Sequence, residues 1–283
     1  MADCSPLKKE IKEFLMDRGA DLVGFAPVSR WEEYDEVHPD FRPAKLFPKA
    51  KTVIVIGMGM PLPVVETTPS SIHMELYNTV NRELDGLAYH LSRMLGRKGI
   101  AAYSFPRDGY GHIRIIKEKP RAAFSHVYAA KYAGLGTIGM NNVLLSKMFG
   151  PRVRWVSVLA EELLKGDEVI EEELCIRCKA CIRCCPVEAL VPKEESYKPE
   201  FKAVVCAQRA EDLTKRRCYP CGICVKVCPI GEDRVLFGAT KKTGLYLQEL
   251  DRGKEDAFSE EFKIWNHYRR WGSWSEEEIK KHE

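Results

Sequence analysis

Eight cysteines fall in two short runs that share one spacing. The runs are Cys175-x2-Cys178-x2-Cys181-x3-Cys185-Pro186 and Cys218-x2-Cys221-x2-Cys224-x3-Cys228-Pro229. Three closely spaced thiolates can reach three irons of one cubane from a single loop. In two-cluster ferredoxins the fourth cysteine, placed before a proline, ligates the other cluster. The spacing therefore predicts two [4Fe–4S] clusters and a protein that moves single electrons.

Zinc sites and disulfide frameworks also use closely spaced cysteines. A structural zinc ion usually takes two Cys-x2-Cys pairs, and a disulfide framework is typical of small secreted domains. Neither alternative accounts for two triplets that are each followed by Cys-Pro. Iron–sulfur ligation is the better interpretation of both runs.

The composition indicates a globular protein without a nucleic-acid or membrane partner. Of 283 residues, 45% are hydrophobic and 30% charged, and the net charge of +3 gives no bulk basic character. The longest apolar run, at 53–60, is too short to span a membrane. The first residues form no secretory or twin-arginine signal. We therefore expect a cytoplasmic protein in an anaerobic or well-reduced setting.

Hydrophobic periodicity predicts the elements that must position the cysteines. Apolar residues recur every three or four positions across residues 72–95, which indicates a long amphipathic helix. The apolar run at 52–56 indicates a buried strand. Further helices are predicted at 8–18 and 122–133, and further strands at 21–27, 100–105 and 152–159.

These elements predict three parts of the chain. Residues 1–165 form an α/β domain, residues 166–238 carry the two clusters, and residues 239–283 form a helical tail that packs on the core. No low-complexity linker separates the parts. We therefore expect the cluster segment to pack directly on the α/β domain, which electron transfer requires.

A glycine-rich segment, Gly134-Leu-Gly136-Thr-Ile-Gly139, matches the G-x-G-x-x-G pattern of dinucleotide sites. In those sites a strand precedes the glycines, whereas residues 124–133 have a helical pattern here. The acidic residue Glu161 is the one further feature that favours a dinucleotide. We predict instead a helix that ends at Gly134, followed by a loop whose glycines let the backbone approach something large and flat.

The segment Ala133–Asn142, the stretch Phe149-Gly-Pro-Arg-Val-Arg154 and the cysteine runs resemble the cobalamin-dependent iron–sulfur proteins, namely the epoxyqueuosine reductases and reductive dehalogenases. The resemblance covers roughly residues 8–235. It implies an α+β fold in which a nitroreductase-like α/β domain binds cobalamin without a protein ligand to cobalt. A two-cluster ferredoxin-like domain would deliver electrons to form cob(I)alamin. By resemblance, the residues near the corrinoid are Lys131, Tyr132, Gly134, Leu135, Gly136, Thr137, Ile138, Gly139, Met140, Asn141 and Asn142.

Several positions depart from the resemblance. Pro120 stands where epoxyqueuosine reductases carry a catalytic aspartate, and His126 stands where they have a glutamate. We also expect no repeat-helical domain of the kind associated with tRNA, and the twin-arginine signal usual in the dehalogenases is missing. The cofactor therefore carries over better than either substrate.

The resemblance leaves one cluster ligand open. Ferredoxin spacing selects Cys218, whereas in the resembling proteins the first cysteine of the second set often lies well upstream, where Cys206 stands. The two predicted ligand sets are Cys175, Cys178, Cys181 and Cys228 for one cluster, and Cys185, Cys221, Cys224 and either Cys206 or Cys218 for the other.

Reduction at a cobalt centre needs a proton donor. The candidate catalytic residues are His126 and Tyr128, on the helix before the glycine loop, and His73 and Tyr77 are further candidates. Any of these side chains could equally serve packing.

We predict an oxidoreductase that takes electrons from a low-potential donor such as ferredoxin or flavodoxin. Two clusters would pass them to cobalamin for reductive chemistry on a small substrate. Two alternatives stay open: a reductase that reactivates a Co(II) corrinoid protein, and an electron-transfer protein with clusters only.

Overall fold

The structure is a computed structural model that describes residues 5–108, 113–194, 196–215 and 217–240, together with Gly244, Tyr246 and Leu247. Most of the predicted tail at 239–283 therefore lies outside the described residues. Within the described part of the chain, no helix has the length and apolar character needed to cross a membrane.

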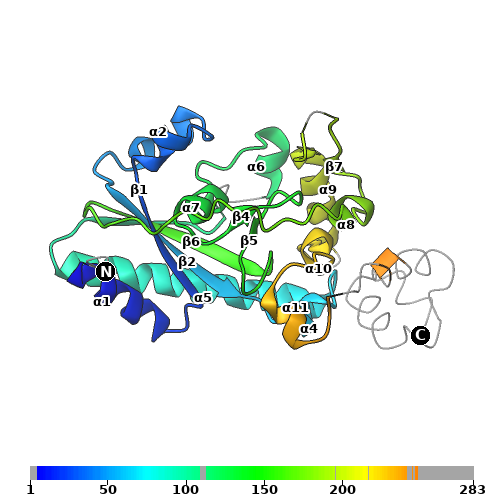
Figure 1. Cartoon of the computed structure of the whole chain (residues 1–283), viewed down its shortest axis with the longest axis horizontal. Coiled ribbons are helices and arrows are strands. Elements are labelled where there is room, and N and C mark those ends of the chain that lie inside the picture. Colours follow the sequence, from blue (N-terminus) through cyan, green and yellow to red (C-terminus); the bar gives the residue numbers. More distant parts are fainter. Residues whose placement is uncertain are drawn as a thin grey trace.

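A four-stranded antiparallel sheet forms the centre of the α/β part (Figure 1). The strand order is β1-β2-β6-β3, and each neighbouring pair is antiparallel. In the register of the sheet, Ile54 of the second strand lies opposite Phe25 on one side and Val158 on the other. The strands are β1 (Leu22–Pro27), β2 (Thr52–Gly59), β3 (Ala102–Phe105) and β6 (Val153–Ala160).

Both faces of this sheet are covered, which explains why β2 is apolar at every position from 53 to 56. Successive side chains of a strand point to opposite faces. Ile54 and Ile56 pack toward α1 and α5, while Val53 and Val55 pack toward α2 and α7. Figure 1 shows these two helix layers on either side of the strands. The helices are α1 (Pro6–Met16), α2 (Arg30–Tyr34), α5 (Ser71–Arg97) and α7 (His126–Tyr132).

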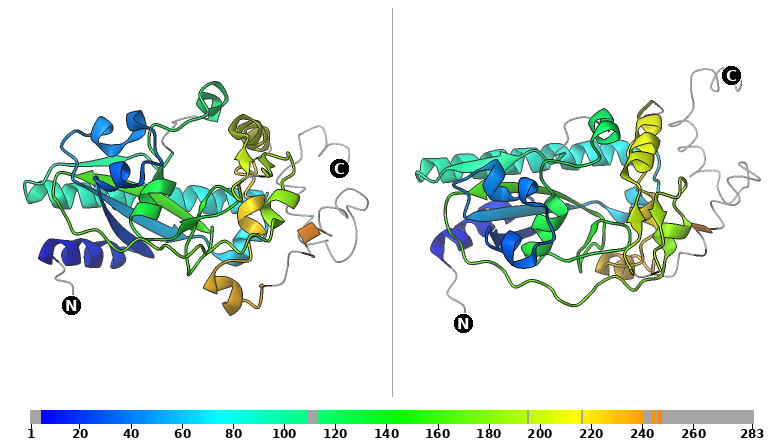
Figure 2. Two further views of the ribbon diagram at one scale, coloured as in Figure 1. Left: turned by 45° about the horizontal axis from the view of Figure 1, so that its top comes forward. Right: turned by 90° about the horizontal axis from the view of Figure 1, so that it is seen from above.

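The long helix α5 confirms the periodicity of the sequence. The Ser70 hydroxyl caps the helix by accepting a hydrogen bond from the amide of His73 at 3.1 Å. Its apolar stripe, which includes Leu84 and Leu91, is fully buried against the sheet. Figure 2 shows that the helix runs along the α/β part and reaches the cysteine-bearing segment at one end.

The cysteine-bearing segment gathers at one end of the molecule (Figure 1). Its short helix α8 contacts α10, and α9 contacts α6 of the α/β part. The elements of this segment are α8 (Ala180–Arg183), β7 (Leu190–Val191), β8 (Glu200–Phe201), α9 (Ala203–Lys215), α10 (Ile223–Lys226) and α11 (Glu232–Leu236). The remaining elements are η1 (Pro39–Phe41), α3 (Pro43–Leu46), α4 (Leu62–Val65), α6 (Ile113–Glu118), β4 (Thr137–Ile138) and β5 (Leu144–Leu145).

Candidate functional site

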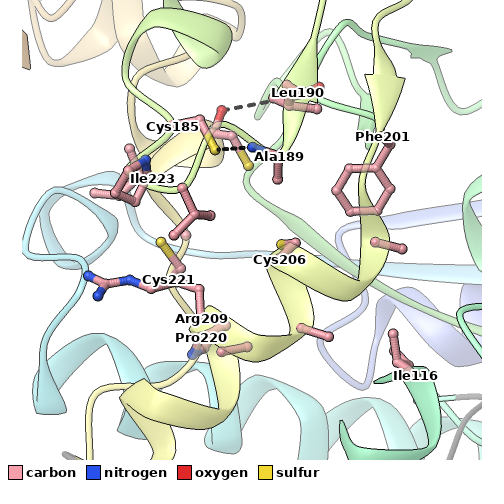
Figure 3. Close-up of a pocket in the computed structure, with 18 of the residues that line it drawn as sticks. Ile116, Cys185, Ala189, Leu190, Phe201, Cys206, Arg209, Pro220, Cys221 and Ile223 are labelled. Atoms are coloured by element: carbon pink, nitrogen blue, oxygen red, sulfur yellow. Dashed lines mark hydrogen bonds between the residues drawn. The ribbon is translucent and has the colours of Figure 1, made fainter. Parts of the chain in front are cut away.

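Seven of the eight cysteines of the two runs, together with Cys206, line two separate cavities. Each cavity draws thiols from both runs, as the crossed ligation of two-cluster ferredoxins requires. The larger of these two cysteine cavities has a volume of about 320 Å³. In Figure 3 the thiols of Cys185, Cys206 and Cys221 surround one open space. The smaller cavity is lined by Cys175, Cys178, Cys181 and Cys228, and the larger by Cys185, Cys206, Cys221 and Cys224.

The thiols surround a volume rather than a point. Among the described residues, no three or more His, Cys, Asp or Glu side chains come close enough to hold a single metal ion. The sulfurs that ligate a cubane lie farther apart than the ligands of one ion, because the cubane itself separates them. The donor type and the placement of both sets therefore fit iron–sulfur clusters.

The two runs fold in the same way locally. Lys179 and Gly222 each take a left-handed conformation, with φ of 59° and 65°, immediately before α8 and α10. Each helix then carries the third cysteine of its run, Cys181 or Cys224, as its second residue. This repeated turn gives the second and third cysteines of each run matching positions.

The pKa values of the thiols also depend on which of the two cysteine cavities each thiol lines. Burial raises the pKa of Cys181 to about 12 and that of Cys206 to about 11, and the next contributions come from thiols of the same cavity. Burial also raises the pKa of Cys224. Cys181 and Cys224 pack in one apolar cluster, so the two sets are neighbours. Such thiols keep their protons until the charge of a bound metal displaces them.

Cys206 and Cys218 occupy different environments. Cys206 lies on α9, is half-buried, and faces the larger cavity (Figure 3). Cys218 is fully buried, and its Sγ lies 3.7 Å from the carbonyl oxygen of Leu213. It does not belong to the described lining of either cysteine cavity. Cys184 is buried in the small core between α8 and α10.

Two buried arginines fix the cysteine segment to the α/β part. Both donate to the carbonyl oxygen of Cys228, Arg152 at 3.2 Å and Arg234 at 3.1 Å. Arg152, just before β6, pairs with Asp233 of α11 at 2.6 Å. Arg234 pairs with Glu66, just after α4, at 2.7 Å. Because both ion pairs join the two parts, the position of Cys228 depends on the α/β part. Neither pairing has a signal in the sequence.

The second cysteine run also rests on the α/β part. The Thr68 hydroxyl donates to the carbonyl of Cys221 at 2.9 Å, and Asn141 donates to the carbonyl of Cys224 at 3.3 Å. His73 is buried beside Thr68, with its Nδ1 3.0 Å from the Thr68 hydroxyl. Burial, and then the charge of Arg154, lowers the pKa of His73 to about 4. This histidine therefore supports the cysteine loop and does not line the large cavity described next.

A third cavity, of about 670 Å³, lies in the α/β part next to the cysteines and is called the large cavity below. Its lining includes the aromatic side chains of Phe41, Phe124 and Trp155 and the charged side chains of Arg107 and Arg154. A volume of this size is within the range of ligand sites. Five residues line both this cavity and the 320 Å³ cysteine cavity, so the two adjoin: Pro120, Arg121, Ala122, Phe201 and Ala203.

The predicted catalytic residues His126 and Tyr128 both line the large cavity. His126 is held at both ring nitrogens: Nε2 lies 2.9 Å from the Pro106 carbonyl, and Nδ1 lies 2.9 Å from the Ser157 hydroxyl. The carbonyl only accepts, so Nε2 carries the proton and Nδ1 accepts from Ser157. Burial lowers the pKa of His126 to about 4, so the ring is neutral at pH 7.

The tyrosines of the cavity are protonated at neutral pH. Burial, and then the Glu36 carboxylate, raises the pKa of Tyr128 above its usual value. Burial raises the pKa of Tyr77 strongly, and its hydroxyl lies 3.4 Å from Asp108. Both hydroxyls therefore carry a proton, but that of Tyr77 is directed at Asp108, as the N–H of His126 is directed at the Pro106 carbonyl.

The glycine loop runs beside the cavities. Asn142 lines the large cavity, Asn141 lines both cysteine cavities, and Met140 lines the smaller one. The left-handed Gly134, at φ +70°, follows the end of α7, as predicted. A side chain on Gly134 would meet the backbone of Glu168, so the close approach that this glycine permits is to the chain itself.

The other residues predicted to contact a corrinoid do not belong to the described lining of the large cavity. Lys131 pairs with Glu36, and the Tyr132 hydroxyl donates to the same carboxylate at 3.3 Å. The Thr137 hydroxyl accepts from the amide of Leu174 at 3.0 Å. Five further positions, which the structure places at the junction of α7, β4 and β5, do not line the large cavity: Gly134, Leu135, Gly136, Ile138 and Gly139.

Comparison with known proteins agrees with this geometry. A family described as a 4Fe-4S dicluster domain matches residues 174–231. The epoxyqueuosine reductase of Bacillus cereus is 24% identical over 251 residues, which cover 80% of this chain. The tetrachloroethene reductive dehalogenase of Dehalobacter restrictus is 26% identical over 235 residues, which cover 77% of this chain. The predicted resemblance is confirmed. This chain is similar in sequence to both groups of reductases.

Solved structures of both groups share the fold. The catabolic reductive dehalogenase NpRdhA in complex with 3-bromo-4-hydroxybenzoic acid matches 95% of this chain with a TM-score of 0.63 and 18% identity. The epoxyqueuosine reductase from Streptococcus thermophilus matches 79% of it with a TM-score of 0.51 and 17% identity. The fold is thus a mixed α/β fold with a ferredoxin-like 4Fe-4S domain. The chain spans 65% of the length of the Bacillus cereus reductase and 38% of that of the Dehalobacter restrictus dehalogenase.

Proposed function

We propose that this protein is an oxidoreductase that carries electrons through two [4Fe–4S] clusters to a cobalamin bound in the large cavity, for reductive chemistry on a small substrate. Residues 1–165 would form a nitroreductase-like cobalamin-binding domain, and residues 166–238 the cluster domain. A low-potential donor such as ferredoxin or flavodoxin would supply the electrons. The observation that carries the proposal is the contact between a four-thiol cavity and the 670 Å³ cavity.

The ligand sets follow from the two cysteine cavities. Cys175, Cys178, Cys181 and Cys228 would hold the first cluster, and Cys185, Cys206, Cys221 and Cys224 the second. Cys206 is preferred to Cys218 because its thiol faces the cavity, while that of Cys218 is packed against the end of α9. The first cluster would lie nearer the surface, since Cys178 is exposed.

The large cavity fits part of a corrinoid. Its aromatic walls suit the face of a flat ring, and its arginines and carboxylates suit the polar groups around the rim of the ring. Its described lining contains no cysteine, and the ring nitrogens of His126 are both occupied. These features support binding without a cobalt ligand from His126. A bound corrinoid would supply a strongly reducing cobalt centre.

The proton for the reduction would come from Tyr128. A tyrosine hydroxyl is protonated at neutral pH; burial and then Glu36 raise the pKa of Tyr128 further, and the residue lines the cavity. His126 would position the wall of the cavity by joining the Pro106 carbonyl to Ser157. A Tyr128→Phe variant should therefore keep its clusters and its cobalamin but lose turnover.

Electron paramagnetic resonance (EPR) tests the cofactor directly. The protein is reconstituted with iron and sulfide without oxygen, mixed with cob(II)alamin, and recorded before and after a low-potential reductant. We expect a base-off Co(II) signal that disappears on reduction. An unperturbed spectrum of free cob(II)alamin would refute cobalamin binding and leave a protein that transfers electrons through clusters only.

The same samples separate the remaining alternative. A reductase for a Co(II) corrinoid protein would reduce cobalamin bound to a partner protein while leaving free cobalamin unbound. Addition of a corrinoid protein in its Co(II) state, with optical detection of Co(I), reports that outcome.

A further inference from the structure

Arg209 stands out among the residues that line the larger cysteine cavity. It lies on α9, three residues after Cys206, so both side chains lie on one face of the helix. Figure 3 shows Arg209 beside Cys221, at the edge of the space that the thiols surround. The Nε atom of Arg209 is buried, and among the described residues it has no hydrogen-bond partner.

The positive charge of Arg209 lies beside this thiol set. The two acidic residues that follow on α9 are paired with lysines: Glu211 with Lys117 at 2.8 Å, and Asp212 with Lys215 at 3.5 Å. Lysines therefore engage these two carboxylates, while the guanidinium of Arg209 lies beside Cys221 at the edge of the cavity (Figure 3).

Among the described residues, the cations near the first thiol set are exposed or paired. Lys179 lines the smaller cavity and Arg183 donates to the carbonyl of Cys178 at 3.3 Å, but both residues are exposed to water. Arg152, which lies near Cys228, is neutralised by Asp233 at 2.6 Å. Arg177 is exposed and pairs with Glu173 at 2.6 Å, and water screens its charge. The two cavities thus differ in electrostatics although their thiols are arranged alike.

We propose that Arg209 is a positioning residue that donates a hydrogen bond and positive charge to the second cluster, and so favours electron transfer from the first cluster to the second. Net charge and hydrogen bonds to the sulfurs set the reduction potentials of such clusters. A nearby cation stabilises the reduced, more negative state. In the step itself, one electron leaves the first cluster and reduces the second, and a low-potential one-electron donor restores the first. No bond forms or breaks. This inference rests on the two clusters of the proposed function.

The test compares Arg209→Gln with the wild type by redox titration of the reconstituted protein, followed by EPR. We expect the midpoint potential of the second cluster to fall by about 59 mV. For one electron this shift changes the equilibrium ratio between the two singly reduced forms of the protein tenfold. The midpoint of the first cluster should stay unchanged. A Cys178→Ser variant identifies the first cluster, because it alters the signal of that cluster alone.

Lys215→Gln is the matched control, since it removes the same charge from an exposed position on the same helix. It should leave both midpoints unchanged. Arg209→Lys keeps a charge but loses the Nε donor, and it replaces Arg209→Gln in the comparison if the glutamine variant cannot hold its second cluster. A second-cluster midpoint equal to that of the wild type overturns the role of Arg209.

Iron and sulfide counts on the same samples separate this result from the larger proposal. A wild type with fewer than two clusters would refute the proposed function. Two clusters with midpoints that do not respond to Arg209 would refute the present inference alone.

Discussion

The choice between Cys206 and Cys218 is the sharpest prediction, because the two cysteines should respond to substitution in opposite ways. Cys206→Ala removes a thiol that faces the larger cysteine cavity. Cys218→Ala removes a fully buried thiol that packs against the end of α9. The first change should cost iron and the second should cost stability.

The expected sizes follow from these environments. Two cubanes hold about eight irons per chain, and loss of one of four thiolate ligands opens a cubane, so Cys206→Ala should retain about four. Cys218→Ala should retain about eight. Its cost is that of a single buried heavy atom removed from a close-packed site, about 1 kcal/mol of unfolding free energy.

The assay is the iron and labile sulfide content of proteins reconstituted without oxygen, together with EPR of the reduced samples. Thermal unfolding of the same samples reports stability. Loss of about half the iron from Cys218→Ala, with Cys206→Ala intact, would refute the ligand set and restore the ferredoxin spacing. Full iron in both variants would refute the whole scheme.

Three further predictions concern the junction and a buried histidine. Asp233→Asn leaves the buried Arg152 with an uncompensated charge, and it should lose about 3–5 kcal/mol of unfolding free energy in urea. Gly222→Ala places a methyl group 2.8 Å from the Thr68 hydroxyl oxygen at φ +65°, and it should lose about 1–3 kcal/mol and weaken iron retention. The pKa of His126 is lowered from 6.5 to about 4 by burial, so below pH 6.5 the unfolded chain binds a proton that the folded protein does not. The stability present above pH 6.5 should therefore fall by up to about 3 kcal/mol as the pH approaches 4, and a His126→Gln variant should lack that part of the slope.

Each of these variants has a matched control in the chain. Glu232→Gln changes an exposed carboxylate on the same helix as Asp233. Gly238→Ala tests a left-handed glycine, at φ +59°, that has nothing within 4 Å of the added carbon. His90→Gln changes an exposed histidine. A variant that costs no more than its control would show that the proposed contact does not contribute.

Much of the fold was predictable because its signals are local. The apolar stripe of the long helix and the apolar run of β2 reflect burial on one face and on two faces, and both elements were located within a few residues. The shorter helix α7 begins at His126, four residues later than predicted, because Ser125 caps it. The antiparallel order of the sheet has no local signal, since it depends on how distant strands pair.

The glycine loop shows where local reasoning fails. The pattern correctly indicated a helix that ends at Gly134. The partner of that glycine, the backbone of Glu168, lies 34 residues away and has no motif. The predicted contact of the loop with a corrinoid stays a prediction, and Asn142 is its one residue in the lining of the large cavity.

By itself, the sequence determined the chemistry of the thiols. The repeated spacing specifies which cysteines share a loop, because the geometry of a tight turn followed by a short helix is a local property. Only the tertiary structure decided which thiols from separate segments face one another, that Cys206 faces Cys221, and that this set adjoins the large cavity. These relations depend on long-range packing, including the buried pairs of Arg152 and Arg234, whose partners lie far away in the chain.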